Sequence, residues 1–305
     1  MPPEPRAASG IWLPLVTPWR DGRLDETSLR RLVRHYATEP VDGLILAATT
    51  GEGLTLDDAE MEQLVTAAAE VVLMTPRPVP VYLGLSGSFT QHVAADLTRT
   101  ERWPIDGYLI TCPYYTRPAQ DGLYAHFATL ANATARPILI YNIPYRTGVN
   151  MHNETMLRLS EYDNIVGVKD CCADPAQSLD LLRHRPPGFA VLTGEDASFH
   201  AALAQGADGG VLASAHVETR AFANMRNRLL AGDQHGALEA WYGLVDLPRL
   251  LFSEPSPAPI KHWLWRIGLI DTPELRLPMT PVSSSLAAVL DREIACRSRV
   301  TPLTA

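Results

Sequence analysis

The chain has 305 residues, of which 46% are hydrophobic and 20% are charged, as in an ordinary globular protein. Its net charge of −8 at pH 7 argues against a nucleic-acid partner, which would need a basic surface. The chain has no apolar run of about 18 residues or more, so we expect no transmembrane helix and no membrane partner. Residues 1–6 do not resemble a signal peptide, and the four cysteines lack metal-site spacing. We therefore expect a cytoplasmic protein with reduced thiols.

Short apolar segments alternate with amphipathic helices along most of the chain. Eight segments are predicted to be buried strands: 11–18, 43–48, 79–85, 107–112, 137–144, 165–169, 189–194 and 209–213. Helices are predicted after Asp25 and at 61–72, 90–100, 122–133 and 153–160. Continuously apolar strands between helices indicate a parallel sheet that is covered on both faces. Eight such units predict an α/β fold of the (β/α)₈ (TIM barrel) type, and no G-x-G-x-x-G motif supports a dinucleotide-binding alternative.

The end of the chain has a different pattern. Beyond about residue 219 no strand is predicted, and helical stretches follow at 221–231, 234–252, 258–268 and 282–295. We therefore divide the chain into a catalytic barrel, 1–225, and a C-terminal helical segment, 226–305, packed on the barrel.

One lysine ends an apolar strand. Only two of the 26 Lys and Arg residues are lysine, Lys169 and Lys261, and Lys169 closes the segment Ile165-Val166-Gly167-Val168. A desolvated lysine loses its proton readily and can form an imine, which arginine cannot do. A lysine in this position can equally extend to solvent or pair with a carboxylate, so the strand by itself leaves both readings open.

The other strand ends carry residues that suit imine chemistry. In a (β/α)₈ barrel the reacting groups lie at the carboxyl ends of the strands, on one face. The polar residues there are Thr49, Thr50, Tyr114, Tyr115, Tyr141, Asn142, Lys169, Thr193 and Glu195, with Arg146 just beyond. They provide an amine nucleophile, groups that transfer protons, and a guanidinium for a carboxylate. No metal-ligand cluster and no Ser–His–Asp combination is present, so we predict no metal and imine chemistry on a keto acid.

These residues stand in segments that resemble one known family. Thr49-Thr50-Gly51-Glu52, Pro113-Tyr114-Tyr115, residues 141–148 and Gly167-Val168-Lys169-Asp170 are similar to the dihydrodipicolinate synthase / N-acetylneuraminate lyase family. Members are class I aldolases on a (β/α)₈ barrel that bind pyruvate as a Schiff base, and the resemblance extends along nearly the whole chain. Within the family, three features look like dihydrodipicolinate synthase: the Thr49-Thr50 pair, Arg146 and Glu254-Pro255-Ser256-Pro257.

The resemblance implies a role for each site residue. Lys169 would form the pyruvate imine without any other cofactor, Tyr141 would act as general acid and base, and Thr49 with Tyr115 would complete a proton relay. The pyruvate-binding residues would be Thr50, Gly194 and Val211, and Arg146 would bind the carboxylate of the second substrate. In the family the second tyrosine reaches across a subunit boundary, which implies a homotetramer built as a dimer of dimers.

The implied reaction condenses pyruvate with aspartate 4-semialdehyde to 4-hydroxy-tetrahydrodipicolinate, in lysine and diaminopimelate biosynthesis. Two departures from the family pattern adjoin the pocket. The chain reads Lys169-Asp170-Cys171-Cys172-Ala173 where such synthases usually read Lys-Glu-Ala-Thr/Ser-Gly, and Ala48 replaces a glycine. An aldolase or hydratase for 2-keto-3-deoxy sugar acids or 4-hydroxy-2-oxoglutarate is therefore the alternative, and a keto-acid-binding protein without turnover is a remoter one.

A further departure concerns regulation. Lysine-inhibited synthases of this family carry a polar site at the dimer interface. Tyr114 of that site is kept, but Asp58, Met61, Ser88 and His92 replace the usual His, His, Asn and Glu. We predict little or no inhibition by lysine.

Overall fold

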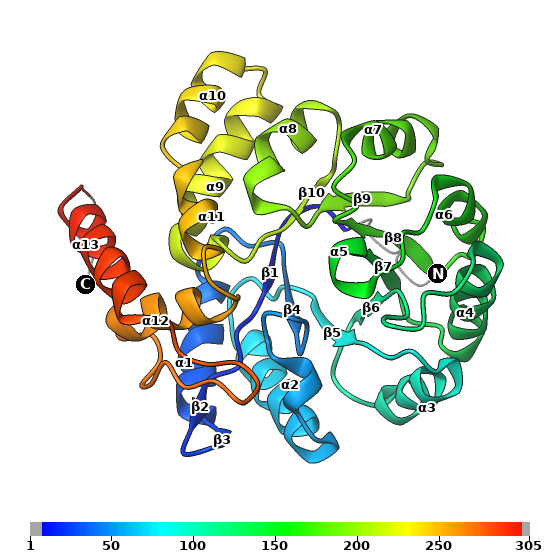
Figure 1. The fold of residues 1–305 in the computed structure, drawn as a ribbon, viewed down its shortest axis with the longest axis horizontal. Coiled ribbons are helices and arrows are strands. Elements are labelled where there is room, and N and C mark those ends of the chain that lie inside the picture. Colours follow the sequence, from blue (N-terminus) through cyan, green and yellow to red (C-terminus); the bar gives the residue numbers. More distant parts are fainter. Residues whose placement is uncertain (1–7, 301–305) are drawn as a thin grey trace.

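The computed structural model describes residues 8–300, so residues 1–7 and residues 301–305 of the C-terminal segment lie outside it. Eight parallel strands close into a barrel in the order β1-β10-β9-β8-β7-β6-β5-β4 (Figure 1). They are β1 (Gly10–Pro14), β4 (Gly43–Leu46), β5 (Val81–Leu85), β6 (Gly107–Thr111), β7 (Ile138–Asn142), β8 (Ile165–Asp170), β9 (Ala190–Thr193) and β10 (Gly209–Val211). The predicted (β/α)₈ barrel is confirmed.

Helices form a ring outside these strands (Figure 1). They are α1 (Glu26–Ala37), α2 (Asp58–Leu73), α3 (Thr90–Thr100), α4 (Gln120–Ala133), α6 (Asn153–Leu159), α7 (Pro175–His184), α8 (Phe199–Ala204) and α9 (Ala215–Leu230). A capping box precedes α2, because the Asp57 side chain accepts from the Glu60 N–H and the Glu60 side chain accepts from the Asp57 N–H. The turn α5 (Pro144–Thr147) lies over the strands instead of in the ring.

Aromatic and aliphatic side chains together fill the inside of the barrel. Trp12 and Tyr82 meet edge to face, with ring centroids 4.7 Å apart. Glycines make room for them: a Cβ at Gly43 would lie 2.4 Å from the Trp12 ring, and one at Gly107 would lie 2.5 Å from the Tyr82 ring. A second, larger apolar layer packs between the strands and the surrounding helices. The interior is therefore a packed core, and chemistry is left to the strand ends.

Several elements differ from the predictions. Helices α7 and α8 were not predicted; α7 begins at Asp174-Pro175, where the Asp174 carboxylate accepts from the Ala176 N–H at 2.9 Å. The single helix predicted over 234–252 is wrong, since α10 (Gln234–Tyr242) and α11 (Asp246–Leu251) are separate. Pro248 prevents one continuous helix there, because its ring would clash with the carbonyl four residues earlier. A small hairpin, β2 (Trp19–Arg20) and β3 (Arg23–Leu24), also escaped prediction.

The C-terminal segment continues with α12 (Ala258–Arg266) and α13 (Ser284–Val300). Two short 3₁₀ turns, η1 (Gly53–Thr55) and η2 (Asp196–Ser198), complete the described elements. The boundary predicted at 225/226 falls inside α9, so no break between elements marks it. The division into two domains stays a prediction. Within residues 8–300 no helix is both long enough and apolar enough to cross a membrane.

Candidate active site

Lys169 lies at the carboxyl end of β8, inside the barrel mouth. It is a register partner of Tyr141 on β7, and its Nζ is 4.0 Å from the centroid of the Tyr141 ring. The side chain is buried, with 6% of the residue exposed. Among the described residues, no carboxylate oxygen lies within 4.0 Å of Nζ. Lys169 therefore neither extends to solvent nor forms an ion pair, which removes both of the alternatives that the sequence left open.

Burial is the main influence on the Lys169 amine. Desolvation lowers the pKa of Lys169, and the positive charge of Arg146 acts in the same direction. Cys171, Asp196 and Glu195 act in the opposite direction but do not reverse the shift. A lower pKa raises the fraction of neutral amine at a given pH, and the neutral amine is the nucleophile that attacks a carbonyl.

This shift predicts how imine formation depends on pH. Below its pKa Lys169 is charged and unreactive, so the rate should rise as pH passes through the lowered pKa and then level off. We expect the enzyme to reach its plateau at a lower pH than Nα-acetyllysine treated with pyruvate in the same way. The rate can be measured by quenching into borohydride under fixed conditions after incubation at each pH. A rise that coincides with that of the free amine would contradict a lowered pKa.

Tyr141 is placed to exchange protons beside this amine. Its ring is buried, and desolvation raises its pKa, as do Cys171 and Tyr145. A side-chain hydrogen bond with Thr49 acts in the opposite direction. The phenol is therefore protonated at neutral pH and can donate to a neighbouring oxygen. The structure thus brings together three of the residues that the sequence selected, from β7, β8 and the turn after β4.

The turn after β4 is held in place by contacts with residues far away in the sequence. Thr50 is buried beside the exposed Thr49. The Thr17 hydroxyl donates to the Gly51 carbonyl at 2.6 Å, and the Glu52 carboxylate forms an ion pair with Lys261 of α12. The two threonines are therefore held by contacts from distant parts of the chain.

Gly194 leaves space for the reactive lysine. It follows β9, and a Cβ at this position would lie 2.3 Å from the Cys171 Sγ and 2.5 Å from the Lys169 Cε. Any larger residue would displace one of these side chains. Val211, the last residue of β10, is also buried, and it pairs in register with Trp12. Both residues lie at the strand ends, where the sequence placed them.

Arg146 lies on the short turn α5, just beyond Tyr141. Its guanidinium carbon is 5.8 Å from the centroid of the Tyr145 ring, and both side chains are exposed. Gly148 ends the turn with φ +78°, and its N–H donates to the Pro144 carbonyl at 2.8 Å. Arg146 is thus held at the rim of the site, where an incoming anion can reach it.

Tyr115 is the one predicted catalytic residue that this chain does not bring to Lys169. Tyr115 is 91% exposed, and its backbone has a positive φ of 69°. Its N–H donates to the Thr147 carbonyl at 3.0 Å, which ties the loop after β6 to α5. A non-glycine residue in this conformation is strained and usually has a functional reason to be there.

The side chains of the unusual residues after Lys169 point alternately into and out of the barrel. Cys171 is buried inside the barrel, as expected two positions after an inward-facing residue. Asp170 faces outward, where its Oδ2 accepts from the Ser178 hydroxyl at 2.5 Å and its Oδ1 accepts from the Cys172 N–H at 3.0 Å. The expectation that this whole segment adjoins the pocket is therefore wrong for the Asp170 and Cys172 side chains and correct for Cys171.

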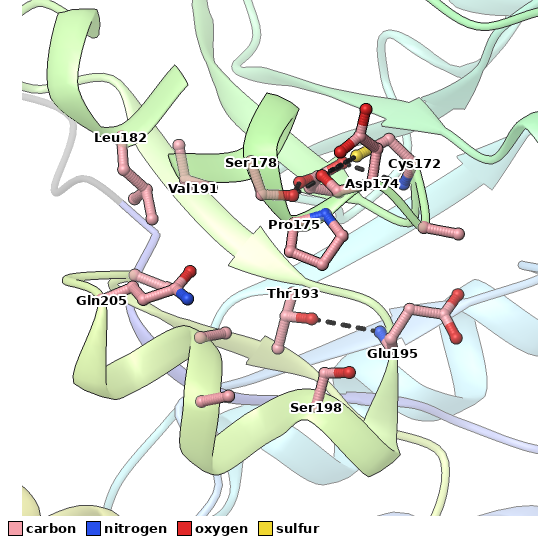
Figure 2. A pocket seen from close by; sticks show the side chains of 15 residues that line it. Cys172, Asp174, Pro175, Ser178, Leu182, Val191, Thr193, Glu195, Ser198 and Gln205 are labelled. Carbon is pink, nitrogen blue, oxygen red and sulfur yellow. Dashed lines mark hydrogen bonds between the residues drawn. The ribbon is translucent and has the colours of Figure 1, made fainter. Parts of the chain in front are cut away.

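Asp170 and Cys172 line a separate groove of about 300 Å³ between α7 and α8. Figure 2 shows Cys172 and Ser178 on one side of this groove and Gln205 on the other. Glu195 lies at its edge, with the carboxylate pointing away from the other side chains. Burial raises the pKa of the Cys172 thiol to about 11, so it stays protonated at neutral pH.

Two residues near Lys169 were not selected from the sequence. Tyr145 was named only within residues 141–148, and Cys171 only as a cysteine and as part of the departure from the family pattern after Lys169. Period-two alternation from Lys169 identifies Cys171 as an inward-facing residue, but nothing local indicates that Tyr145 and Cys171 both lower the pKa of Glu195. No group of three or more His, Cys, Asp or Glu residues within 8–300 could hold a metal ion.

A buried, unpaired lysine beside a phenol, at the carboxyl end of a (β/α)₈ barrel, is the arrangement of a class I aldolase. Comparisons with known proteins agree. The sequence model of the dihydrodipicolinate synthetase family matches residues 7–295. A 4-hydroxy-tetrahydrodipicolinate synthase 2 of Clostridium acetobutylicum is 43% identical over 283 residues, which cover 93% of this chain and 98% of the relative.

Solved structures show the same relationship. Dihydrodipicolinate synthase from Aquifex aeolicus superposes with a TM-score of 0.91 at 31% identity, covering 95% of this chain and 98% of that one. A chloride-inhibited dihydrodipicolinate synthase from Acinetobacter baumannii, complexed with pyruvate, superposes with a TM-score of 0.89 at 31% identity. The match covers 96% of this chain and 99% of that one. The chain belongs to the dihydrodipicolinate synthetase family and is an enzyme of the pyruvate-dependent lyase type.

Proposed function

We propose that this chain condenses pyruvate with aspartate 4-semialdehyde to give 4-hydroxy-tetrahydrodipicolinate. The observation that carries the proposal is the buried, unpaired Lys169 amine 4.0 Å from the Tyr141 ring, with Arg146 at the rim. The names of the relatives support the same reaction, because the Clostridium acetobutylicum protein is a 4-hydroxy-tetrahydrodipicolinate synthase. The Acinetobacter baumannii structure contains pyruvate.

The first half of the reaction forms the imine. The neutral Lys169 amine attacks C2 of pyruvate, and Tyr141 supplies the proton with which the C2 hydroxyl leaves as water. Loss of a proton from the pyruvate methyl group then gives an enamine, whose electrons are delocalised through the imine nitrogen. Thr50 and the backbone at Gly194 and Val211 would bind the pyruvate. No cofactor is needed beyond this covalent bond.

The second half joins the two substrates. The enamine carbon attacks the aldehyde carbon of the semialdehyde, and the aldehyde oxygen takes up a proton to become a hydroxyl. The amino group of the semialdehyde then attacks C2, which closes the six-membered ring and releases the Lys169 amine. Arg146 would hold the carboxylate of the semialdehyde, since guanidinium groups bind carboxylates in a two-pronged geometry.

Tyr115 would complete the proton relay from a neighbouring subunit. Its exposed ring and strained backbone are what a side chain needs if it reaches into a partner's site. We propose a homotetramer built as a dimer of dimers, acting in the cytoplasm.

Initial rates with a panel of aldehydes and keto acids test the function. With pyruvate present, we expect turnover of aspartate 4-semialdehyde, and little or no turnover of 2-keto-3-deoxy sugar acids or 4-hydroxy-2-oxoglutarate. Product formation can be followed by coupling to a reductase that consumes the cyclic product. No turnover of the semialdehyde, together with turnover of a keto-deoxy acid, would contradict the proposal and favour the catabolic alternative. Pyruvate binding without an imine and without any turnover would indicate a binding protein.

A further inference from the structure

Asn142 is a buried polar residue that the proposed reaction does not use. The sequence selected it because it ends β7, directly after Tyr141. It is 1% exposed, and its side chain points to the outside of the barrel, since the neighbouring Tyr141 ring lies inside. Burying an amide is costly unless its donor and acceptor atoms are both paired, so Asn142 needs partners in the protein.

These partners form a closed ring of four hydrogen bonds. The Met151 N–H donates to the Asn142 Oδ1 at 3.1 Å, and the Asn142 Nδ2 donates to the Asn150 Oδ1 at 2.9 Å. The Asn150 Nδ2 donates to the Gln177 Oε1 at 2.7 Å, and the Gln177 Nε2 donates to the Met151 carbonyl at 2.9 Å. The amide ring, as we call these four residues, therefore begins and ends on the backbone of the buried Met151.

Met151 fixes the direction of every hydrogen bond in the amide ring. A backbone N–H can only donate and a backbone carbonyl can only accept, so each side-chain amide between them has a single possible orientation. A reversed amide would place oxygen against oxygen. Replacing one member of the ring therefore leaves its two neighbours with unpaired groups, and these neighbours cannot turn over to compensate.

The amide ring closes the loop that carries Arg146. Asn142 and Met151 are the two ends of this loop, and Arg146 lies near its middle, on α5. Gln177 anchors the ring on α7, the helix that follows the strand of Lys169. Because α5 spans only four residues, it cannot hold its own position. The place of the Arg146 guanidinium relative to Lys169 should therefore depend on the ring.

The loop after β6 holds the same segment from another side. The Arg117 Nε donates to the Gly148 carbonyl at 2.8 Å, and the Gln120 Nε2 donates to the Asn150 carbonyl at 2.8 Å. The Gln120 Oε1 accepts from the His152 N–H at 3.0 Å. None of these bonds uses a side chain of the amide ring, so they remain when such a side chain is replaced. Loss of the ring should therefore shift the Arg146 loop without unfolding it.

We propose that Asn142, Asn150 and Gln177 are positioning residues, which hold Arg146 in place for the carboxylate of the second substrate. Their hydrogen bonds lie outside the strand barrel, whereas the Lys169 amine lies inside it, so imine formation should not depend on them. This inference rests on the proposed function, in which Arg146 binds that carboxylate, and it adds the residues that determine where Arg146 stands.

Gln177→Met tests the proposal without changing a strand residue of the site. Methionine has a similar length but cannot donate to the Met151 carbonyl. We expect the KM for aspartate 4-semialdehyde to rise roughly 10-fold, because a two-pronged contact with a carboxylate depends on the placement of the guanidinium. Borohydride trapping of pyruvate should change by less than about 2-fold. Gln177→Glu keeps the size and the acceptor, and it should raise the KM at least as much, since a carboxylate cannot donate.

Asn164→Leu is the matched control. The Asn164 Nδ2 also donates to backbone carbonyls, those of Ala131 and Thr134, at 2.9 and 2.7 Å, and both Asn164 and Gln177 are half-buried. Asn164 stands just before β8, at the opposite end of the barrel from Lys169. The control should therefore leave the KM and pyruvate trapping within about 2-fold of the wild type. A KM increase of the same size in both variants would contradict the proposal.

A second background separates positioning from a general structural effect. In Arg146→Met the guanidinium is absent, so adding Gln177→Met should lower kcat/KM for the semialdehyde by less than about 2-fold, against roughly 10-fold in the wild type. Equal losses in the two backgrounds would overturn the proposal, because the amide ring would then act independently of Arg146.

Hydrogen exchange tests the amide ring without any substrate. In Gln177→Met we expect the backbone amides of residues 143–151 to exchange about 10-fold faster than in the wild type, while those of Asn164→Leu stay unchanged there. Unchanged exchange in Gln177→Met would refute the holding role. If the wild type does not turn over aspartate 4-semialdehyde, the proposed function fails, and the exchange measurement still decides whether the ring holds the Arg146 loop.

Discussion

Replacing Lys169 with arginine is expected to abolish the covalent pyruvate adduct and to lower kcat by about 10⁴-fold or more, the scale seen when an enzyme loses its nucleophile. Arginine keeps the positive charge but cannot form an imine. In the wild type, borohydride reduction in the presence of pyruvate should add one pyruvate-derived group to the peptide that contains Lys169. Intact mass and peptide mapping measure both results.

Lys261 is the internal control for this experiment, because it is the only other lysine. It is fully buried and paired with Glu52, so we expect no adduct on it. An arginine beside the Tyr141 ring could disturb folding, and Lys169→Met, which is uncharged and of similar length, separates that effect from chemistry. An adduct on Lys261, or catalysis retained in both variants, would contradict the assignment of Lys169.

Lys261→Met is expected to lower the free energy of unfolding by about 3–5 kcal/mol, the cost of removing one member of a buried ion pair. Lys261 is 0% exposed, and its Nζ forms an ion pair with Glu52 and donates to the Glu274 carbonyl at 2.8 Å. The Glu52 carboxylate also accepts from the Trp19 indole N–H at 3.1 Å and from the Arg276 N–H at 3.0 Å. Without Lys261 this buried carboxylate keeps two donors but loses its counter-charge.

The matched control is an exposed ion pair of similar geometry. Arg228 Nη1 lies 2.9 Å from the Asp233 Oδ2, with side chains 47% and 46% exposed. Arg228→Met should therefore cost about 1 kcal/mol or less. Urea unfolding at fixed protein concentration compares the two variants. Similar small losses of unfolding free energy in both variants would show that the buried ion pair contributes little to stability. Since Glu52 follows the Thr49 turn, Lys261→Met should also lower kcat in the fraction that stays folded.

Much of the fold could be predicted from the sequence. Parallel strands in a barrel are buried on both faces, so each strand appears in the sequence as a continuous apolar run. Such a run can be recognised without knowing which strands lie beside it. The elements that were missed have weaker local patterns. Leu181 is the only buried side chain that the ten residues of α7 contribute, and α8 spans just six residues. Their helical state depends on packing against neighbouring elements, α6 for α7 and β10 and α9 for α8, which a local reading of the chain does not include.

The site was predicted as far as residue type and strand position allow. Tyr141 and Lys169 were selected because they end neighbouring strands, and the register that pairs them confirms that they face each other. The role predicted for Tyr115 cannot be seen in a single chain. Its side chain is exposed there, and the proposed role requires a neighbouring subunit. Cys171 shows a second limit, because only the fold places its thiol against Gly194, which follows a different strand.

The sequence by itself determined that this chain is a (β/α)₈ barrel with a lysine at one strand end, and residue types at the other ends limited the chemistry to imines. It could not determine whether Lys169 is free to react or paired with a carboxylate. Lys169 and Lys261 are both buried, but Glu52, 209 residues away in the chain, neutralises Lys261, whereas Lys169 has no carboxylate within 4.0 Å among the described residues. Reactivity depends on the absence of a counter-charge, which is a property of long-range contacts, and only the tertiary structure decides those.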